Sequence, residues 1–312
     1  MSRPDPFRQA AGVVIRYFAE SRPIHANTLI LTIYGDLVHD FGGSLWLGSL
    51  IRLVQPLGIN ERLVRTSVFR LAEKGMLQAS QVGRRSYYRL TRRGQRQHAS
   101  AARRIYASTP PAWDQRWRLV LTSIGQLGPE QREQVRRELA WLGFIRIDAG
   151  IHAHPTVDID TVRRALDDLG LQEQVAVLEA GASDPELLAV ANRLIGCSFD
   201  IPALNEQYSD FIDHFSPVLK AARQSARMDP ELCFLVRTLL INRFRLLLRQ
   251  QPELPAELLE PDALSLQARN LTRALYLCCS APADAHFLAL GETRHGKLTR
   301  PGPAYYQRFS AP

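Results

Sequence analysis

The sequence predicts an α+β multidomain protein with three parts, and three observations lead to this prediction. Helical periodicity with glycine turns and a strand pair fills residues 1–108 and predicts an N-terminal winged helix-turn-helix. Strands and helices alternate as β-α-β-β-α-β in residues 109–198, the order of a ferredoxin-like domain. Residues 199–312 are helical throughout and predict an all-α C-terminal domain.

Three helices are expected in the N-terminal part. Residues 27–41 have apolar side chains at spacings of three and four, and Gly42 and Gly43 end this helix. Ser44 is a candidate N-cap for a helix over residues 45–56, and a third helix begins after Asn60 and ends before Gly75. Two helices joined by a short glycine turn are typical of a helix-turn-helix.

The third helix has one apolar side and one side suited to DNA. Strands at 77–82 and 86–90 follow it, so the turn between them carries arginines, as the wing of a winged helix does. Guanidinium groups suit phosphates and guanine edges, although exposed helix arginines are more often only solvated. The predicted DNA-binding residues of the helix and the turn are Arg62, Arg65, Thr66, Arg70, Arg84 and Arg85.

The charge distribution supports a polyanionic partner. The net charge is +8, but residues 1–110 contain 17 Lys/Arg and 6 Asp/Glu, so the basic excess belongs to the N-terminal part. From Lys74 to Trp113 there are nine Lys/Arg and no carboxylate. Such a surface favours DNA or RNA as the partner.

Composition excludes several other classes. No apolar stretch is long enough to cross a membrane and residues 1–10 lack a signal-peptide core, so we expect a cytoplasmic protein without a membrane partner. The four cysteines (Cys197, Cys233, Cys278, Cys279) have no zinc-ligand spacing. No nucleophile elbow, phosphate loop or dinucleotide motif occurs, and we therefore expect no enzyme, no catalytic residue, no cofactor and no metal.

The middle part leaves one alternative open. Its first predicted strand, residues 117–124, has no carboxylate, which a metal-dependent nuclease on this fold would need. His152 and His154 share a strand face and Asp158 and Asp160 lie nearby, so a metal site is the minor alternative to ordinary surface residues. The expected role of this part is mechanical, in pairing protomers or passing a signal.

The C-terminal part is expected to form helices over residues 203–224, 229–250, 262–280 and 283–290. The second helix is apolar on nearly every side, which predicts a buried central helix. Arg237 lies on its apolar side and needs a partner, either a protein carboxylate or the phosphate of a ligand. Thr238, Asn242, Arg245 and Arg249 form a narrow polar stripe.

Motifs along the whole chain resemble the PaaX family of transcriptional repressors. They occur in the order GGSLWLGSL (42–50), ERLVRTSVFRLAEKGML (61–77), GRRSYYRL (83–90), PAWD (111–114), WLGF (141–144), CFLVRTLLINRFR (233–245) and GPAYYQRF (302–309).

The resemblance implies a homodimeric repressor of phenylacetate catabolic genes that leaves its operator DNA when phenylacetyl-coenzyme A binds. The expected effector-binding residues are Arg237, Asn242, Arg245 and Arg249, and Arg245 is the one that falls on the family's recurrent arginine. Asn242 departs from the family, which often has histidine there. The alternative functions are a metal-dependent nuclease-like or an RNA-binding protein.

Overall fold

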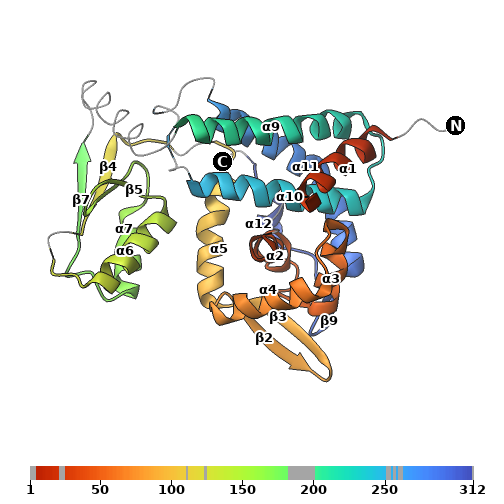
Figure 1. Cartoon of the computed structure of the whole chain (residues 1–312), viewed down its shortest axis with the longest axis horizontal. Helices are drawn as coiled ribbons and strands as arrows, with labels where there is room; N and C mark the ends of the chain where they lie inside the picture. Colours follow the sequence, from red (N-terminus) through yellow and green to blue (C-terminus); the bar gives the residue numbers. More distant parts are fainter. Residues whose placement is uncertain are drawn as a thin grey trace. The chain divides into compact units, whose positions relative to one another are not determined.

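The computed structural model describes residues 5–20, 25–109, 112–122, 125–181, 201–250, 254–255, 258 and 263–310. The chain is a mixed helix and strand protein that divides into two compact units (Figure 1). The first unit contains residues 1–108, 210–245 and 267–312, and the second contains residues 109–209 and 246–266. The N-terminal part and most of the C-terminal helices therefore lie in one unit.

The first unit begins with helices α1 (Pro6–Glu20) and α2 (Ala26–Ile33), and α2 continues into a π-helical turn at Tyr34–Val38. Helices α3 (Leu47–Val54) and α4 (Glu61–Glu73) follow.

The prediction that Ser44 caps the second helix is wrong. Residues Ser44–Trp46 form a short strand, β1, and α3 starts only at Leu47. β1 pairs with a strand more than forty residues later in the sequence, opposite Tyr87–Arg89, which local periodicity cannot show.

The hairpin after α4 occurs where the sequence predicts it. Strands β2 (Leu77–Val82) and β3 (Arg85–Leu90) pair antiparallel, and the sheet order is β1-β3-β2. Helix α5 (Arg92–Ile105) follows. Thr91 caps its N-terminus, because the Thr91 hydroxyl oxygen accepts from the backbone N of Gly94 at 3.0 Å. The same hydroxyl donates to the carbonyl oxygen of Gly75 at 2.6 Å, so Thr91 links the start of α5 to the end of α4.

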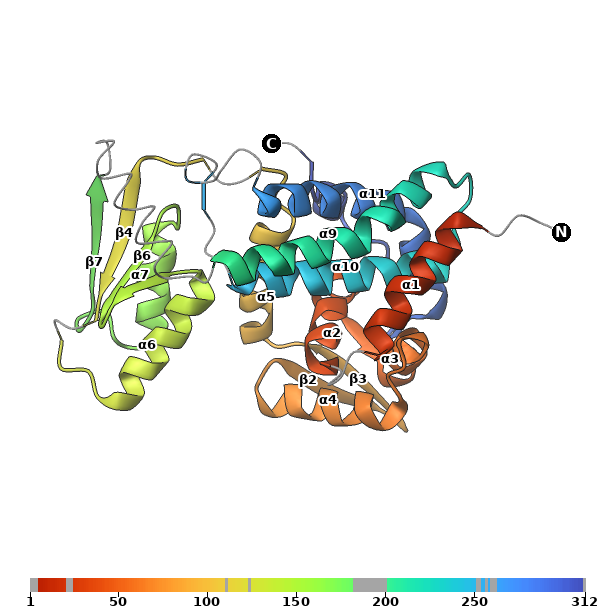
Figure 2. The same cartoon turned by 45° about the horizontal axis from the view of Figure 1, so that its top comes forward.

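The C-terminal segments are α9 (Ile201–Gln224), α10 (Pro230–Gln250), α11 (Leu264–Leu290), the two-stranded β8 (Glu292–Thr293) and β9 (Gly296–Lys297), and α12 (Pro303–Tyr306). Helix α10 is buried on nearly every side, as predicted, and in Figure 2 it runs directly below α9 and above α2. The prediction of two helices separated at Pro282 is wrong, because α11 is continuous and contains Pro282.

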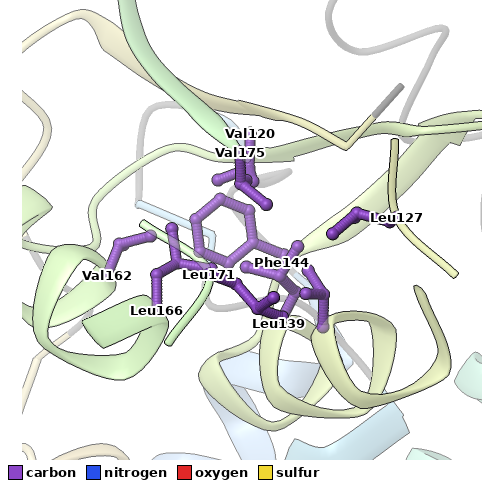
Figure 3. Close-up of a cluster of buried hydrophobic side chains, with 9 residues drawn as sticks. Val120, Leu127, Leu139, Phe144, Val162, Leu166, Leu171 and Val175 are labelled. Carbon is purple, nitrogen blue, oxygen red and sulfur yellow. The ribbon is translucent and has the colours of Figure 1, made fainter. Parts of the chain in front are cut away.

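The second unit has a four-stranded antiparallel sheet in the order β5-β6-β4-β7, covered by two helices. Nine apolar residues between the sheet and the helices form its core (Figure 3): Val120, Leu127, Val135, Leu139, Phe144, Val162, Leu166, Leu171 and Val175. The elements are β4 (Arg116–Leu121), α6 (Pro129–Leu142), β5 (Ile145–Asp148), β6 (Ile151–His154), α7 (Ile159–Asp168) and β7 (Ala176–Gly181).

The end of the predicted middle domain at residue 198, the linker prolines Pro110 and Pro111, and Cys197 lie outside the described residues. Among the helices that are described, none combines the length and the apolar character required to cross a bilayer.

Candidate functional site

Helix α4 has one buried and one exposed side, and the exposed side carries the predicted DNA-binding residues. Its N-terminus is capped by Asn60, whose Oδ1 accepts from the backbone N of Leu63 at 2.9 Å. The buried side consists of Val64, Ser67, Val68 and Leu71. The exposed residues are Arg62, Arg65, Thr66, Phe69 and Arg70, together with the acidic Glu61 and Glu73.

Some of the polar side chains on this side already bind other groups of the protein, and others do not. Arg65 forms an ion pair with Glu61, one turn earlier, at 2.6 Å. The Thr66 hydroxyl donates to the carbonyl oxygen of Arg62 at 2.9 Å. No carboxylate of the described residues forms an ion pair with Arg62 or Arg70, so these two guanidinium groups face solvent.

The turn of the hairpin places two arginines side by side with different surroundings. Gly83 has φ +57°, a left-handed conformation that glycine adopts without steric cost. Arg84 is exposed and, in the described part of the chain, pairs with no carboxylate. Arg85 forms an ion pair with Glu292 at 2.6 Å, and its guanidinium carbon lies 4.4 Å from the centre of the Trp46 ring. Arg85 is therefore held against the protein, whereas Arg84 extends from it.

The exposed arginines form a surface suited to a polyanion, because guanidinium groups bind phosphate oxygens with charge-assisted hydrogen bonds. Helix α5 adds the exposed Arg92, Arg93 and Arg103. Tyr87, on β3, belongs to the core with 6% exposure, and Tyr88 is partly buried.

Arg237 occupies the opposite environment, inside the first unit with 1% exposure. Its Nε donates to Asp36 Oδ2 and its Nη1 to Asp284 Oδ1, both at 2.8 Å. Its Nη2 donates to the hydroxyl oxygens of Tyr276 at 2.8 Å and Tyr305 at 2.7 Å. Of the two partners considered for Arg237, the structure therefore contains the protein carboxylate.

Asp36 is the centre of this buried network. Its Oδ1 also accepts from Arg308 at 3.1 Å and from the hydroxyls of Tyr106 and Tyr276. Burial by itself would raise the pKa of Asp36, but the positive charges of Arg237 and Arg308 outweigh burial and hold the pKa below its ordinary value. Burial raises the pKa of Asp284 in spite of Arg237. Asp36 is thus the more secure negative charge of the two.

The other predicted effector residues are not brought together. Asn242 is buried, and its Oδ1 accepts from the Thr32 hydroxyl at 3.3 Å. Arg245 is partly buried and lies in the first unit, whereas Arg249 is exposed and belongs to the second unit, where its guanidinium carbon lies 5.8 Å from the centre of the Trp141 ring.

Arg245 lines a small pocket of the first unit that opens to solvent and has a cavity volume of about 30 Å³. The pocket lies among α2, its π-helical turn, the base of the hairpin, α5 and α10. Its walls are therefore shared by the elements that carry the basic surface and by the central C-terminal helix. The polar lining residues are Thr32, Asp36, Gln97, His98, Tyr106 and Arg245, and the apolar ones include Leu31, Met76, Leu90, Ile105 and Ile241.

The metal alternative finds no support in the described part of the second unit. His152 and His154 are buried rather than on the surface, at 6% and 2% exposure. The Nδ1 of His154 accepts from the backbone N of Thr156 and of Val157, and Asp158 caps α7. Across all described residues, no group of three or more His, Cys, Asp or Glu side chains is placed to hold a metal ion.

The sequence reasoning missed Asp36, Glu292 and Arg308. Each takes part in a contact between segments more than 200 residues apart, and only the strong predicted burial of Arg237 gave a signal, because a buried guanidinium requires a carboxylate. Nothing in the local pattern indicated which carboxylate that would be.

Comparison with known proteins identifies relatives along nearly the whole chain. Residues 25–94 match the PaaX-like protein family, residues 110–189 the PaaX protein central Cas2-like domain, and residues 199–289 the PaaX-like protein C-terminal domain. The chain is 33% identical over 310 residues to the transcriptional repressor PaaX of Escherichia coli (strain K12), covering 99% of this chain and 95% of that protein.

Among solved structures, an uncharacterized protein from Mycobacterium tuberculosis aligns with 76% of this chain and 89% of its own, at 23% identity and a TM-score of 0.45. The sequence matches, rather than this structural likeness, identify the family. Three family regions in the expected order and 33% identity over almost the full length show that the chain belongs to the PaaX family.

Proposed function

We propose that the chain is a transcriptional repressor that binds double-stranded operator DNA through α4 and the β2–β3 hairpin. Its E. coli relative is a transcriptional repressor, which supports a regulator and not an enzyme. In this proposal residues 1–108 are a winged helix, α4 enters the major groove and the hairpin is the wing. A repressor acts where the genes are, so the proposal places the chain in the cytoplasm.

One observation carries the DNA-binding role. Arg62, Arg70 and Arg84 are exposed on adjacent elements, and none of them pairs with a carboxylate of the described residues. Exposed arginines in an ordinary surface are interspersed with acidic partners, as Arg136 and Glu133 are in the second unit at 2.7 Å. Exposed arginines without carboxylate partners, on a helix and the neighbouring turn, are suited to bind the phosphate backbone of duplex DNA.

Substitution of two of these arginines tests the proposal. Arg70→Ala and Arg84→Ala should each weaken binding to the DNA upstream of the chain's own gene about tenfold, and should leave the thermal midpoint unchanged. The measurement is a gel shift at several salt concentrations, with Arg163→Ala as the matched control, since Arg163 is an exposed helix arginine of the second unit. Unchanged affinity in both variants would disprove this DNA face, and better competition by RNA than by duplex DNA would favour the RNA-binding alternative.

We propose further that a coenzyme A thioester of an aryl acetic acid, such as phenylacetyl-coenzyme A, occupies the pocket at Arg245. A guanidinium suits the phosphates of the coenzyme, and the apolar lining suits an aromatic ring. Met76, directly before β2, and Leu90, the last residue of β3, line the same pocket. A ligand there therefore contacts the base of the proposed wing. Thr32, which also lines the pocket, lies 3.3 Å from Asn242 Oδ1, and its hydroxyl donates to the carbonyl oxygen of Thr28 at 2.9 Å.

In this proposal the other two arginines have different roles. Arg237 already binds two carboxylates and two tyrosines, and we assign it to the folded core. Arg249 belongs to the other unit, so it serves as a control. Calorimetry should give binding heat with phenylacetyl-coenzyme A, about a tenfold loss of affinity in Arg245→Met and no loss in Arg249→Met. Absence of heat with every aryl-acetyl thioester would remove the effector role and leave the DNA-binding role intact.

We also propose a homodimer of three-domain subunits. The β-α-β-β-α-β element order and the sheet order β5-β6-β4-β7 support a ferredoxin-like middle domain, and the matched family description for this region is Cas2-like. Two-fold symmetry suits an operator with two half-sites. Sedimentation equilibrium that gives the mass of one chain at micromolar concentration would contradict the dimer.

A further inference from the structure

Phe69 on α4 is the most exposed large hydrophobic side chain of the described residues, at 62% exposure. It follows Thr66 by three positions and Arg65 by four, so it lies on the same side of the helix as the predicted DNA-binding residues. Among the described residues, its ring contacts no other aromatic ring. A phenyl ring therefore faces solvent on the side of α4 that carries Arg65 and Arg70, with Glu73 one turn further along.

The fold gives no reason for an aromatic residue at this position. Helix α4 is anchored by its other side, where Val64, Val68 and Leu71 are each at most 2% exposed. A phenylalanine left in water forgoes the stabilisation that burial would provide. A polar residue would serve a solvated helix better, so the ring points to a partner outside the chain.

We propose that Phe69 contacts the 5-methyl groups of thymine in the major groove, which makes it a sequence-reading residue of the repressor. This inference rests on the proposed binding of DNA by α4. The positive charges around Phe69 make duplex DNA the occupant of this surface, and the thymine methyl is the apolar group that base edges present in the major groove. The neighbouring Thr66 donates its hydroxyl hydrogen to the carbonyl oxygen of Arg62 within the helix, so this hydrogen is not available to a base edge.

The test uses the full-length chain and one duplex in two forms. The duplex carries the sequence that the wild-type protein selects from a random double-stranded library, synthesised once with thymine and once with deoxyuridine at every thymine position. Deoxyuridine keeps all hydrogen-bonding groups of thymine and lacks only the methyl. The variants are Phe69→Ala, Phe69→Leu and Arg70→Ala, with Leu277→Ala on α11 as a control for the loss of an exposed apolar side chain.

The wild type should bind the thymine duplex about fourfold more tightly for each methyl that is contacted, which corresponds to about 0.8 kcal/mol. Phe69→Ala should bind the two duplexes equally, because its affinity for the thymine form falls and that for the deoxyuridine form does not. Phe69→Leu should retain part of the preference. Arg70→Ala should lose affinity for both forms by the same factor, and Leu277→Ala should behave as the wild type.

The outcomes separate the two proposals. If the wild type selects no duplex, the DNA-binding function fails and the reading role fails with it. If the wild type selects a duplex but the thymine preference is absent, or is unchanged in Phe69→Ala, only the role of Phe69 is overturned. If Phe69→Ala alters the sedimentation mass and not the preference, the ring packs against a second copy of the chain, and the proposal is likewise wrong.

Discussion

The arginines on α4 and the hairpin can be compared with those around Asp36, because both sets lie in the first unit and have opposite surroundings. Arg62, Arg70 and Arg84 are exposed and pair with no carboxylate of the described residues. Arg237 and Arg308 have side chains that are 1% and 9% exposed, and both bind Asp36. A guanidinium in water keeps its hydration and is available to an external anion, whereas a buried one must be satisfied by the protein.

The exposed and the buried arginines should respond differently to substitution. Removal of an exposed arginine should alter binding and leave stability unchanged, because the fold gains little from a solvated side chain. Removal of a buried partner should alter stability first, since it leaves uncompensated charge inside the protein.

The largest effect is expected at the centre of the buried network. Asp36→Asn removes the charge that Arg237 and Arg308 share, and should lower the free energy of unfolding by about 3–5 kcal/mol. Urea denaturation monitored by circular dichroism measures it. The control is Glu133→Gln, which breaks an exposed pair with Arg136 and should cost at most about 1 kcal/mol. Equal losses in the two variants would refute the contrast.

Lowering the pH should reduce the free energy of unfolding over a defined range, because of a buried histidine. Burial, with the nearby charges of His39, Arg308 and Arg245, lowers the pKa of His98 to about 4 from 6.5. The unfolded state then binds the proton more readily, so stability is complete above pH 6.5 and falls between pH 6.5 and 4, by up to about 3 kcal/mol. Below that range the lowered pKa of Asp36 adds a second loss as its carboxylate is protonated.

The measurement is the urea midpoint at pH 7 and at pH 5. His98→Gln should reduce the difference between the two midpoints, whereas substitution of the exposed His295 by Gln should not. The readout is the difference between pH values, so a constant cost of either substitution does not affect it. A wild-type midpoint that does not change over this range would show that His98 titrates normally.

The two arginines of the hairpin turn allow a comparison within the exposed set. Arg84→Ala should weaken DNA binding about tenfold and lower the salt dependence by about one phosphate contact. Arg85→Ala should weaken binding only about twofold, because Glu292 and Trp46 already hold the Arg85 guanidinium. Gel shifts at three salt concentrations distinguish them. A stronger loss in Arg85→Ala would mean that Glu292 releases this arginine to the DNA.

The smallest expected effect is an increase in DNA affinity. Glu292 lies 2.6 Å from Arg85 and 3.9 Å from Arg52, so Glu292→Gln leaves two exposed guanidinium groups without their carboxylate. Affinity for any duplex should rise about threefold, with a steeper salt dependence, since phosphates replace the lost partner. Glu179→Gln, which breaks pairs with Arg116 and Arg118 in the second unit, is the control and should leave affinity unchanged.

Some of these features follow from the sequence alone. Helix α4, with its Asn60 cap, lies where periodicity places it, and the strands of the hairpin follow it. The exposed arginines of α4 and the hairpin turn were also predicted, because amphipathic spacing and a carboxylate-free stretch are local properties. Local hydrogen bonds and side-chain spacing determine such elements, and neither depends on distant residues.

Other features were decided only by the tertiary structure. Arg237 was recognised as buried, yet its partner Asp36 lies 201 residues away in the sequence, and Glu292 lies 207 residues from Arg85. Ser44 joins a strand because β3 pairs with it, and Pro282 lies within α11 although its ring removes a helical hydrogen bond. The packing of the N-terminal elements and α10 into one unit likewise depends on contacts between distant segments. Periodicity reports which side of an element is buried, but the partner of a buried charge is determined only when the whole chain has folded.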